Sequence, residues 1–205
     1  MGSVTKELEV KFYLANKSSL QGTLINLGAS LVQTRIHEHN LRFDTVEGRL
    51  TSNEQVLRLR KGHANHLTYK GPSDVKTGVS ARTEIEFSVD NFDKAQNLLE
   101  ALGYRVSMIY EKYRTVYELN NTLITIDEMP FGDFAEIEGT DRANIEKVCN
   151  QLGLIWEHRS LKSYAVLFEI VKKNLNLDFR DLTFDNFVGI KIDAGHFALS
   201  PADAT

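Results

Sequence analysis

Charged and apolar residues alternate along the first strand-like segment of the chain. Its charged residues are Glu7, Glu9 and Lys11, and the residues next to them are leucine, valine and phenylalanine. Because side chains two apart on a β-strand share a face, one face of this segment is charged and the other is apolar. The same alternation recurs in four further pairs: Arg58/Arg60, Glu84/Glu86, Lys112/Arg114 and Glu136/Glu138. A sheet of such strands can close into a barrel or deep groove, with its charges inside, when helices cover its apolar face.

Hydrophobic periodicity and turn residues predict an α+β domain with about eight strands and four helices. Strands are expected at residues 5–14, 30–44, 55–62, 65–71, 81–89, 105–119, 122–128 and 133–139. Helices are expected at residues 17–28, 91–101, 141–152 and 160–173, and a polar, mobile loop at residues 72–80. Since most strands follow one another as hairpins, with helices inserted between some of them, the sheet is expected to be antiparallel.

The composition excludes several classes of protein. The chain has 205 residues, of which 42% are hydrophobic and 25% charged, which suits a domain with a packed core. The formal net charge of −4 argues against a nucleic-acid partner, because phosphates favour a basic surface. No apolar run approaches the roughly 20 residues of a membrane span, and no signal peptide is evident, so we expect a cytoplasmic protein. The single Cys149 excludes an internal disulfide and a cysteine-based zinc site.

The end of the chain is expected to differ from what precedes it. We assign residues 1–172 to the domain and residues 173–205 to a C-terminal extension. The extension holds four of the 11 phenylalanines: Phe179, Phe184, Phe187 and Phe197. Disordered tails are poor in aromatic residues, so we expect this one to pack on the domain or on a second subunit of a homodimer. A structural appendage is the first interpretation, and a lid over a site is the alternative.

Gathering so many charges in one interior costs free energy unless something compensates them. One compensation is pairing across strands, which contributes about 0.2–1 kcal/mol for each pair on a half-exposed sheet. The other is a ligand that carries both signs, such as a polyphosphate with bound divalent cations. Arginine and lysine bind phosphate oxygens, whereas carboxylates bind Mg²⁺ or Mn²⁺. The charge pattern therefore favours phosphoryl or nucleotidyl chemistry.

The order of these motifs resembles that of a known family. Residues 7–11 (ELEVK) match the E-x-E-x-K signature of the CYTH superfamily, the triphosphate tunnel metalloenzymes. Further matching segments follow in the family's order: Leu57–Arg60, Leu67–Pro72, Arg82–Glu86, Glu111–Arg114, Ile126–Glu128 and Gly132–Gly139. The resemblance covers about residues 5–168. The segments T-Y-K-G-P, R-x-E-I-E and G-D-F-x-E-I-E are most similar to the class IV adenylyl cyclase branch.

The resemblance implies an eight-stranded antiparallel barrel whose tunnel binds a triphosphate. The implied phosphate-binding residues are Lys11, Arg58, Arg60, Lys70, Lys112 and Arg114, with Arg82 and Lys162 as further candidates. The implied ligands of Mg²⁺ or Mn²⁺ are Glu7, Glu9, Asp127, Glu136 and Glu138. For Glu84 and Glu86 the resemblance leaves two alternatives: they bind the metal, or they orient the lysines and arginines. By the same resemblance, catalysis depends on Glu7, Glu9, Lys11, Asp127 and Glu136.

Three functions remain open at this point. An adenylyl cyclase would convert ATP to cyclic AMP and pyrophosphate. A triphosphatase would direct water at tripolyphosphate, thiamine triphosphate or a nucleoside triphosphate. A non-catalytic module would only bind a polyphosphate or nucleotide. The shared motifs suit all three, because each needs the same cations.

Two other patterns have a functional and a structural interpretation. His37 and His39 have the spacing of metal ligands on one strand face, but no third ligand is evident, so solvated histidines are expected. Tyr69, Tyr110 and Tyr113 are candidates for stacking on a base at the tunnel mouth. Packing in the core or at the rim is the expectation for these tyrosines.

Overall fold

The computed structural model describes residues 4–74 and 78–203, with side chains described from Leu8 onward. Its strands are β1 (Val4–Leu14), β2 (Ser30–Asp44), β3 (Val56–Lys61), β4 (Asn65–Lys70), β5 (Ser80–Ser88), β6 (Arg105–Leu119), β7 (Thr122–Met129) and β8 (Gly132–Gly139). Its helices are α1 (Lys17–Asn26), α2 (Arg49–Ser52), α3 (Phe92–Ala101), α4 (Arg142–Gln151) and α5 (Tyr164–Leu175), with 3₁₀ turns η1 (Trp156–His158), η2 (Asp185–Phe187) and η3 (Ala194–Phe197). Each predicted strand is present, with ends that differ from the prediction by at most about one residue.

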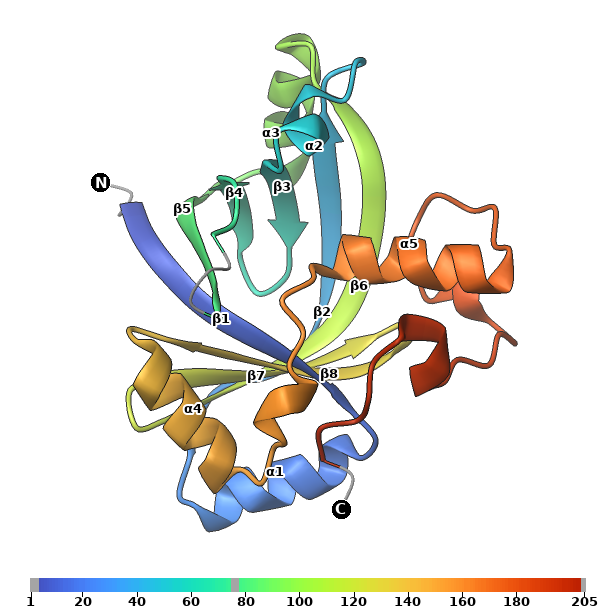
Figure 1. The fold of residues 1–205 in the computed structure, drawn as a ribbon. Coiled ribbons are helices and arrows are strands. Elements are labelled where there is room, and N and C mark those ends of the chain that lie inside the picture. The colour runs from blue at the N-terminus through green and yellow to red at the C-terminus, as the bar shows by residue number, and fades with distance from the viewer. Residues whose placement is uncertain (1–3, 75–77, 204–205) are drawn as a thin grey trace.

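The strands form one closed ring in the order β1-β5-β4-β3-β2-β6-β7-β8 (Figure 1). All neighbouring pairs are antiparallel, and β1 closes the ring by pairing with β5 along one edge and β8 along the other. A closed ring leaves no strand edge exposed over its paired length. The predicted eight-stranded antiparallel barrel is therefore confirmed.

Helices cover the apolar outer face of the ring. Leu20 of α1 and Ile145 of α4 lie in one buried cluster with strand residues such as Ile137. Leu99 of α3 lies in another with Leu59 of β3. Because the alternate side chains of these strands are covered by helices, their charged faces point into the barrel. None of the helices in residues 4–74 and 78–203 combines the length and apolar composition that crossing a membrane requires.

Two helices differ from the sequence-based prediction. Helix α5 begins at Tyr164, rather than at residue 160, because the Ser163 side chain caps it. Ser160 instead forms a backbone bridge with Lys11 of β1. The short helix α2 was not predicted, and the Asp44 carboxylate stabilises it by accepting hydrogen bonds from two N–H groups of its first turn, both within 2.9 Å.

The predicted loop at residues 72–80 falls partly on residues 75–77, which lie outside the described residues. Before this gap, Asp74 pairs with Ala81 in an isolated antiparallel bridge. After the gap, β5 begins at Ser80, one residue before the predicted start.

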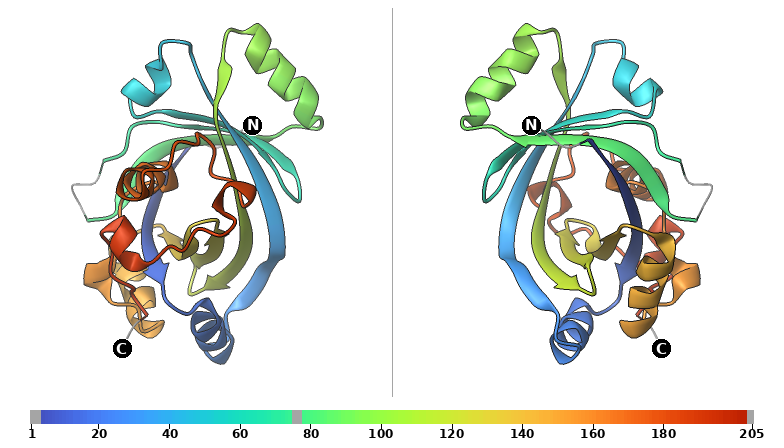
Figure 2. Two further views of the ribbon diagram at one scale, coloured as in Figure 1. Left: turned by 90° about the vertical axis from the view of Figure 1, so that its right-hand side faces the viewer. Right: turned by 90° about the vertical axis from the view of Figure 1, so that its left-hand side faces the viewer.

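Residues that follow α5 pack on the barrel of the same chain. Phe187 and Phe197 lie in a buried cluster with Phe131 and Phe168. The Asp203 carboxylate accepts hydrogen bonds, each 2.7 Å long, from two backbone N–H groups just after β1. Figure 2 (left) shows this orange-to-red segment lying across one end of the barrel. The predicted boundary between residues 172 and 173 falls inside α5.

Candidate functional site

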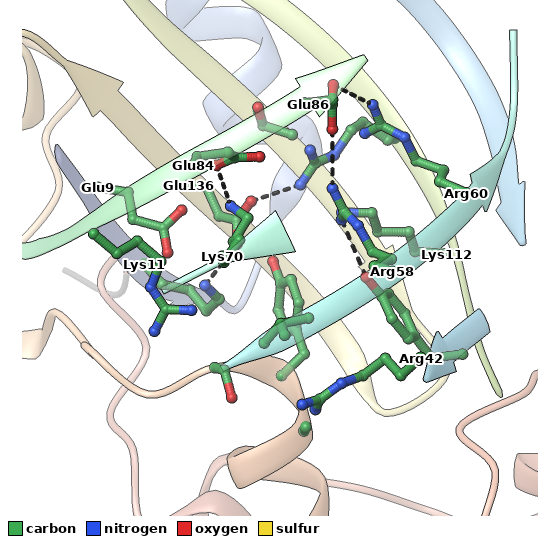
Figure 3. A pocket seen from close by; sticks show the side chains of 18 of the residues that line it. Glu9, Lys11, Arg42, Arg58, Arg60, Lys70, Glu84, Glu86, Lys112 and Glu136 are labelled. Carbon is green, nitrogen blue, oxygen red and sulfur yellow. Dashed lines mark hydrogen bonds and ion pairs between the residues drawn. The ribbon is translucent and has the colours of Figure 1, made fainter. Parts of the chain in front are cut away.

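A cavity of about 240 Å³ lies inside the barrel (Figure 3). Its charged lining comprises Glu9, Lys11, Arg42, Arg58, Arg60, Lys70, Arg82, Glu84, Glu86, Lys112, Arg114, Glu136 and Glu138. Its uncharged lining includes Val56, Met108, Tyr110, Tyr164, Ala165 and Leu182. The alternating charged pairs that the sequence singles out therefore converge on one interior space.

Among the predicted site residues whose side chains the structure describes, Lys162 and Asp127 do not contribute to this lining. The side chain of Glu7 lies outside the described residues, although its backbone pairs with that of Arg82 between β1 and β5. Lys162 is exposed in the segment before α5. Asp127 is fully buried and does not reach the cavity surface. The substrate and metal roles of these three residues stay predictions.

Asp127 is surrounded by groups that donate hydrogen bonds to its carboxylate. Lys112 Nζ lies 3.0 Å from Oδ2, and Arg114 binds both oxygens through Nε and Nη2, at 2.6 and 2.5 Å. The Tyr164 hydroxyl, at the start of α5, donates to Oδ2 at 2.8 Å. A forked arginine–carboxylate contact fixes both partners in place. In this arrangement Asp127 positions Lys112 and Arg114 for the cavity.

Glu136 links two of the predicted phosphate-binding residues. Its Oε1 lies 2.6 Å from Lys11 Nζ, and its Oε2 lies 2.5 Å from Arg114 Nη2. Burial disfavours the ionised carboxylate, but attraction to Lys11 and Arg114 outweighs it and holds the pKa of Glu136 well below its usual value. Glu136 is therefore ionised at neutral pH and keeps both cations at the cavity wall.

Two glutamates of β5 hold the cations of β3 and β4. The Nη2 atoms of Arg58 and Arg60 lie 3.4 and 3.2 Å from the two oxygens of Glu86. Lys70 Nζ lies 2.7 Å from Glu84 Oε2. Burial opposes the ionisation of Glu86, but attraction to Arg60 and neighbouring groups lowers its pKa. These contacts orient the cations, and a metal-binding role for the two glutamates stays a prediction.

The sequence-based reasoning missed Glu38, which lies between two histidines of β2. Glu38 is only 2% exposed, and its oxygens lie 3.4 Å from Arg60 Nη1 and 3.7 Å from Lys112 Nζ. Burial opposes its ionisation, but attraction to Lys112 and other cations lowers the pKa of Glu38 to about 2. His37 and His39 lie on the opposite, outer face. Strand parity could have found Glu38, since an acid between two outward histidines must point inward.

Glu9 and Glu138 lie directly opposite each other in the β1–β8 register, and both line the cavity. Like charges in this position destabilise a sheet unless a cation accompanies them. Carboxylate oxygens are the ligands that Mg²⁺ and Mn²⁺ prefer, so this donor set fits the predicted metal. In residues 4–74 and 78–203, no three histidine, cysteine, aspartate or glutamate side chains are grouped closely enough to hold a metal ion. The full ligand set stays a prediction.

The cavity has a different character around Arg42 of β2, a residue that the sequence-based reasoning also missed. In Figure 3 Arg42 lies beyond Arg58, away from the carboxylates. Met108 lies opposite Arg42 in β6, and Leu182 of the C-terminal segment pairs with the neighbouring Tyr110. Within the described residues, the Arg42 guanidinium has no hydrogen bond or ion pair, and burial lowers its pKa. This part of the cavity is therefore cationic and apolar.

The three tyrosines that the sequence offered for base stacking lie in different places. Tyr110 lines the cavity, and its hydroxyl accepts a hydrogen bond from Arg58 Nη1 at 3.2 Å. Tyr113 instead lies beneath the exposed Arg35, whose guanidinium carbon is 3.6 Å from the ring centre. Tyr69 does not line the cavity. Of the three, only Tyr110 is placed to contact a ligand there.

Comparison with known proteins agrees with this geometry. The model of the CYTH domain matches residues 5–152. Adenylate cyclase CyaB of Aeromonas hydrophila is 27% identical over 176 residues, which cover 80% of this chain and 88% of that protein.

Two solved structures share the fold. A Vibrio parahaemolyticus protein has a TM-score of 0.72 at 22% identity and covers 82% of this chain and 99% of its own. A Hippeastrum protein, described as having a dominant triphosphatase activity, has a TM-score of 0.60 at 24% identity and covers 80% of this chain and 95% of its own. At these identities the two structures show the fold alone. The match to the family model, which spans most of the chain, shows that the chain belongs to the CYTH domain family.

Proposed function

We propose that this protein is a divalent-metal-dependent adenylyl cyclase of the class IV type, which converts ATP to cyclic AMP and pyrophosphate. The observation that carries the proposal is a barrel cavity lined by a lysine or arginine from each of strands β1 to β6, with carboxylates among them. The likeness to adenylate cyclase CyaB directs the choice of reaction. Binding of ATP, tripolyphosphate or thiamine triphosphate is the wider expectation. A cytoplasmic location and a homodimer stay predictions.

The cations of the cavity would bind the triphosphate chain. Lysine contributes a point charge and arginine a fork that suits two phosphate oxygens at once. Lys11, Lys112 and Arg114 are already held in place by buried carboxylates, so little side-chain freedom is lost when the substrate binds. Arg58 and Arg60 extend the same surface along β3. This arrangement would fix the phosphates and leave the α-phosphorus at one defined position.

Glu9 and Glu138, together with Glu7, are the residues that we propose hold Mg²⁺ or Mn²⁺. When bound, the metal would lower the pKa of the attacking hydroxyl and neutralise charge on the leaving group. In the reaction, the ribose 3′-hydroxyl loses its proton to solvent and its oxygen bonds to the α-phosphorus, while the bond from that phosphorus to the oxygen shared with the β-phosphorus breaks and pyrophosphate leaves. The side chains then have two tasks: the carboxylates hold cations near the reacting phosphorus, and the lysines and arginines hold the departing pyrophosphate.

A triphosphatase is the second candidate. The same cations would bind any triphosphate, and water would attack a terminal phosphorus instead of a ribose hydroxyl. The Hippeastrum protein of the same fold is described as having a dominant triphosphatase activity, which makes this reaction the one to test beside cyclisation.

The test incubates the pure protein with ATP, tripolyphosphate or thiamine triphosphate, each with Mg²⁺ and with Mn²⁺. Cyclic AMP and phosphate release are both measured. Cyclic AMP from ATP supports the cyclase, and its absence with every metal overturns it. Phosphate release from tripolyphosphate that greatly exceeds ATP turnover supports the triphosphatase. Binding without any turnover supports the non-catalytic module.

Four variants test the site itself. Glu7→Gln and Glu136→Gln should mainly lower metal-dependent turnover. Each removes a negative charge that would hold the metal ion or the neighbouring lysine and arginine in place. Arg58→Ala and Lys112→Ala should mainly weaken triphosphate affinity. Unchanged kinetics in all four variants would refute the assignment of the cavity as the active site.

A further inference from the structure

The C-terminal segment completes the wall of the barrel where β7 ends. Strand β7 pairs with β6 only from Tyr113 to Leu119. Before Tyr113, β6 has β2 on one side, and Leu182 occupies the other side. The Leu182 N–H donates to the Ile109 carbonyl at 2.9 Å, and its carbonyl accepts from the Glu111 N–H at 2.9 Å. A strand edge left without a partner exposes such groups, so this contact replaces the missing length of β7.

The same segment is anchored firmly on both sides of Leu182. The Asp181 carboxylate accepts a hydrogen bond from the Ile109 N–H at 2.8 Å. The Phe184 N–H donates to the Glu111 carboxylate at 3.1 Å. Leu182 is itself fully buried, as is most of Phe187. These contacts describe a fixed wall, which Figure 2 (left) shows at one end of the barrel.

Leu182 supports an apolar part of the cavity wall from behind, because it is fully buried and the partly buried Met108 and Tyr110 pack against its cluster. It lines the cavity together with Met108, Tyr110 and Ala165, and Arg42 lies among them. Met108 faces Arg42 across β2 and β6, and Tyr110 bridges to Leu182, so these groups are neighbours. Phosphate oxygens gain nothing from the apolar side chains. A flat aromatic ring would gain from the apolar side chains and from Arg42, since it can pack on methionine and stack on a guanidinium or tyrosine.

We propose that Leu182 of the C-terminal segment, with Met108, Tyr110 and Arg42, forms the subsite for the aromatic base of a nucleoside triphosphate. The segment would then set the preference of the cavity between nucleotides and inorganic triphosphate. The inference rests on the proposed function, because it requires that the cavity binds the triphosphate part of the same ligand.

The test measures the binding of ATP and tripolyphosphate to the full chain by titration calorimetry with Ca²⁺ as the cation. Leu182→Ala should weaken ATP binding by about tenfold, because it removes the buried support of Met108 and Tyr110, on which the base would pack, and should leave tripolyphosphate binding within about twofold. Leu182→Met, which conserves the volume, should restore ATP affinity. Val188→Ala is the matched control, since Val188 lies in the same segment but is 80% exposed.

The outcomes separate this inference from the proposed function. Equal weakening of both ligands, or no change in either, overturns the subsite. If the unchanged protein binds neither ligand, the proposed function fails. If Leu182→Ala does not fold, photolabelling of the unchanged protein with 8-azido-ATP decides the question. Label on Met108, Tyr110 or residues 181–184 supports the subsite, and label elsewhere overturns it.

Discussion

The cavity contains two regions that differ in whether their cations are paired with carboxylates. In the paired region, formed by Asp127, Glu136 and Glu38 with their cations, carboxylates hold Lys112 and Arg114 at fixed positions. In the Arg42 region, a half-buried guanidinium has no such partner among the described residues. The contrast indicates that a cation paired with a carboxylate both stabilises the fold and binds the ligand. The charge of Arg42 would instead be neutralised by the ligand. Substitutions should therefore affect stability as well as ligand binding in the paired region, and mainly ligand binding in the Arg42 region.

The largest effect is expected for Arg114→Ala. It removes the forked partner of Asp127, which is fully buried, and leaves that charge poorly compensated. Breaking a buried pair in this way costs about 3–5 kcal/mol of unfolding free energy. Chemical denaturation measures the loss, and Arg114→Lys, which keeps the charge, is the matched control. A loss below about 1 kcal/mol would show that the paired region is not needed for the fold.

Glu38→Gln should have the next largest effect. The pKa of Glu38 in the folded protein is about 2, below the usual 4.5, so its ionised form stabilises the fold above pH 4.5. That difference corresponds to about 3 kcal/mol at pH 7, and it is lost as the pH falls from 4.5 toward 2. Urea denaturation across this range should show the wild type and the variant converging in stability. A constant gap between them would contradict the assignment.

Arg42→Met should show the opposite pattern. Because no carboxylate of the described residues bonds to Arg42, the unfolding free energy should change by only about 0.5 kcal/mol. ATP affinity should fall by about tenfold, since the cation is available to the ligand. Thermal unfolding and ligand titration on the same sample compare the two quantities. A large loss of stability with unchanged binding would remove the distinction between the two regions.

The smallest effect is expected for Lys162→Ala. Lys162 is one of the phosphate-binding candidates that the family resemblance implies, but it is exposed and does not line the cavity. Affinity for tripolyphosphate should change by less than about twofold, as is usual for surface sites away from a ligand. Titration with tripolyphosphate and Ca²⁺ checks this. A tenfold loss of affinity would show that Lys162 contacts the phosphates and belongs with the phosphate-binding residues.

Much of the fold could be predicted because alternation with a period of two repeats in nearly every strand. The start of α5 was misplaced because residues 160–163 form a backbone bridge and a cap, and neither changes the apolar pattern. Helix α2 was missed because it is a single turn that Asp44 stabilises from outside the helix. Hydrogen bonds of single polar side chains, rather than the apolar pattern, decide both elements.

The candidate site was predictable where like charges come in pairs, and harder to predict where they do not. Glu38 and Arg42 lie on the inner face of β2 with Asn40 between them, so no like-charged pair marks the strand. Asp127 could be placed on the inner face by parity. The hydrogen bonds that its carboxylate accepts from Lys112, Arg114 and Tyr164 could not be predicted. The spacing of residues along the sequence does not give the distances between side chains of different elements.

The double pairing of β1 also has a consequence for how the chain folds. Strand β1 pairs with β5 and with β8, and both partners are far along the sequence. Such non-local contacts slow folding. At ordinary rates of translation, β1 waits on the order of 10 s before β8 leaves the ribosome. During that interval Val10 and Phe12 lack the β8 part of their buried cluster, which leaves them open to non-native apolar contacts in the nascent chain.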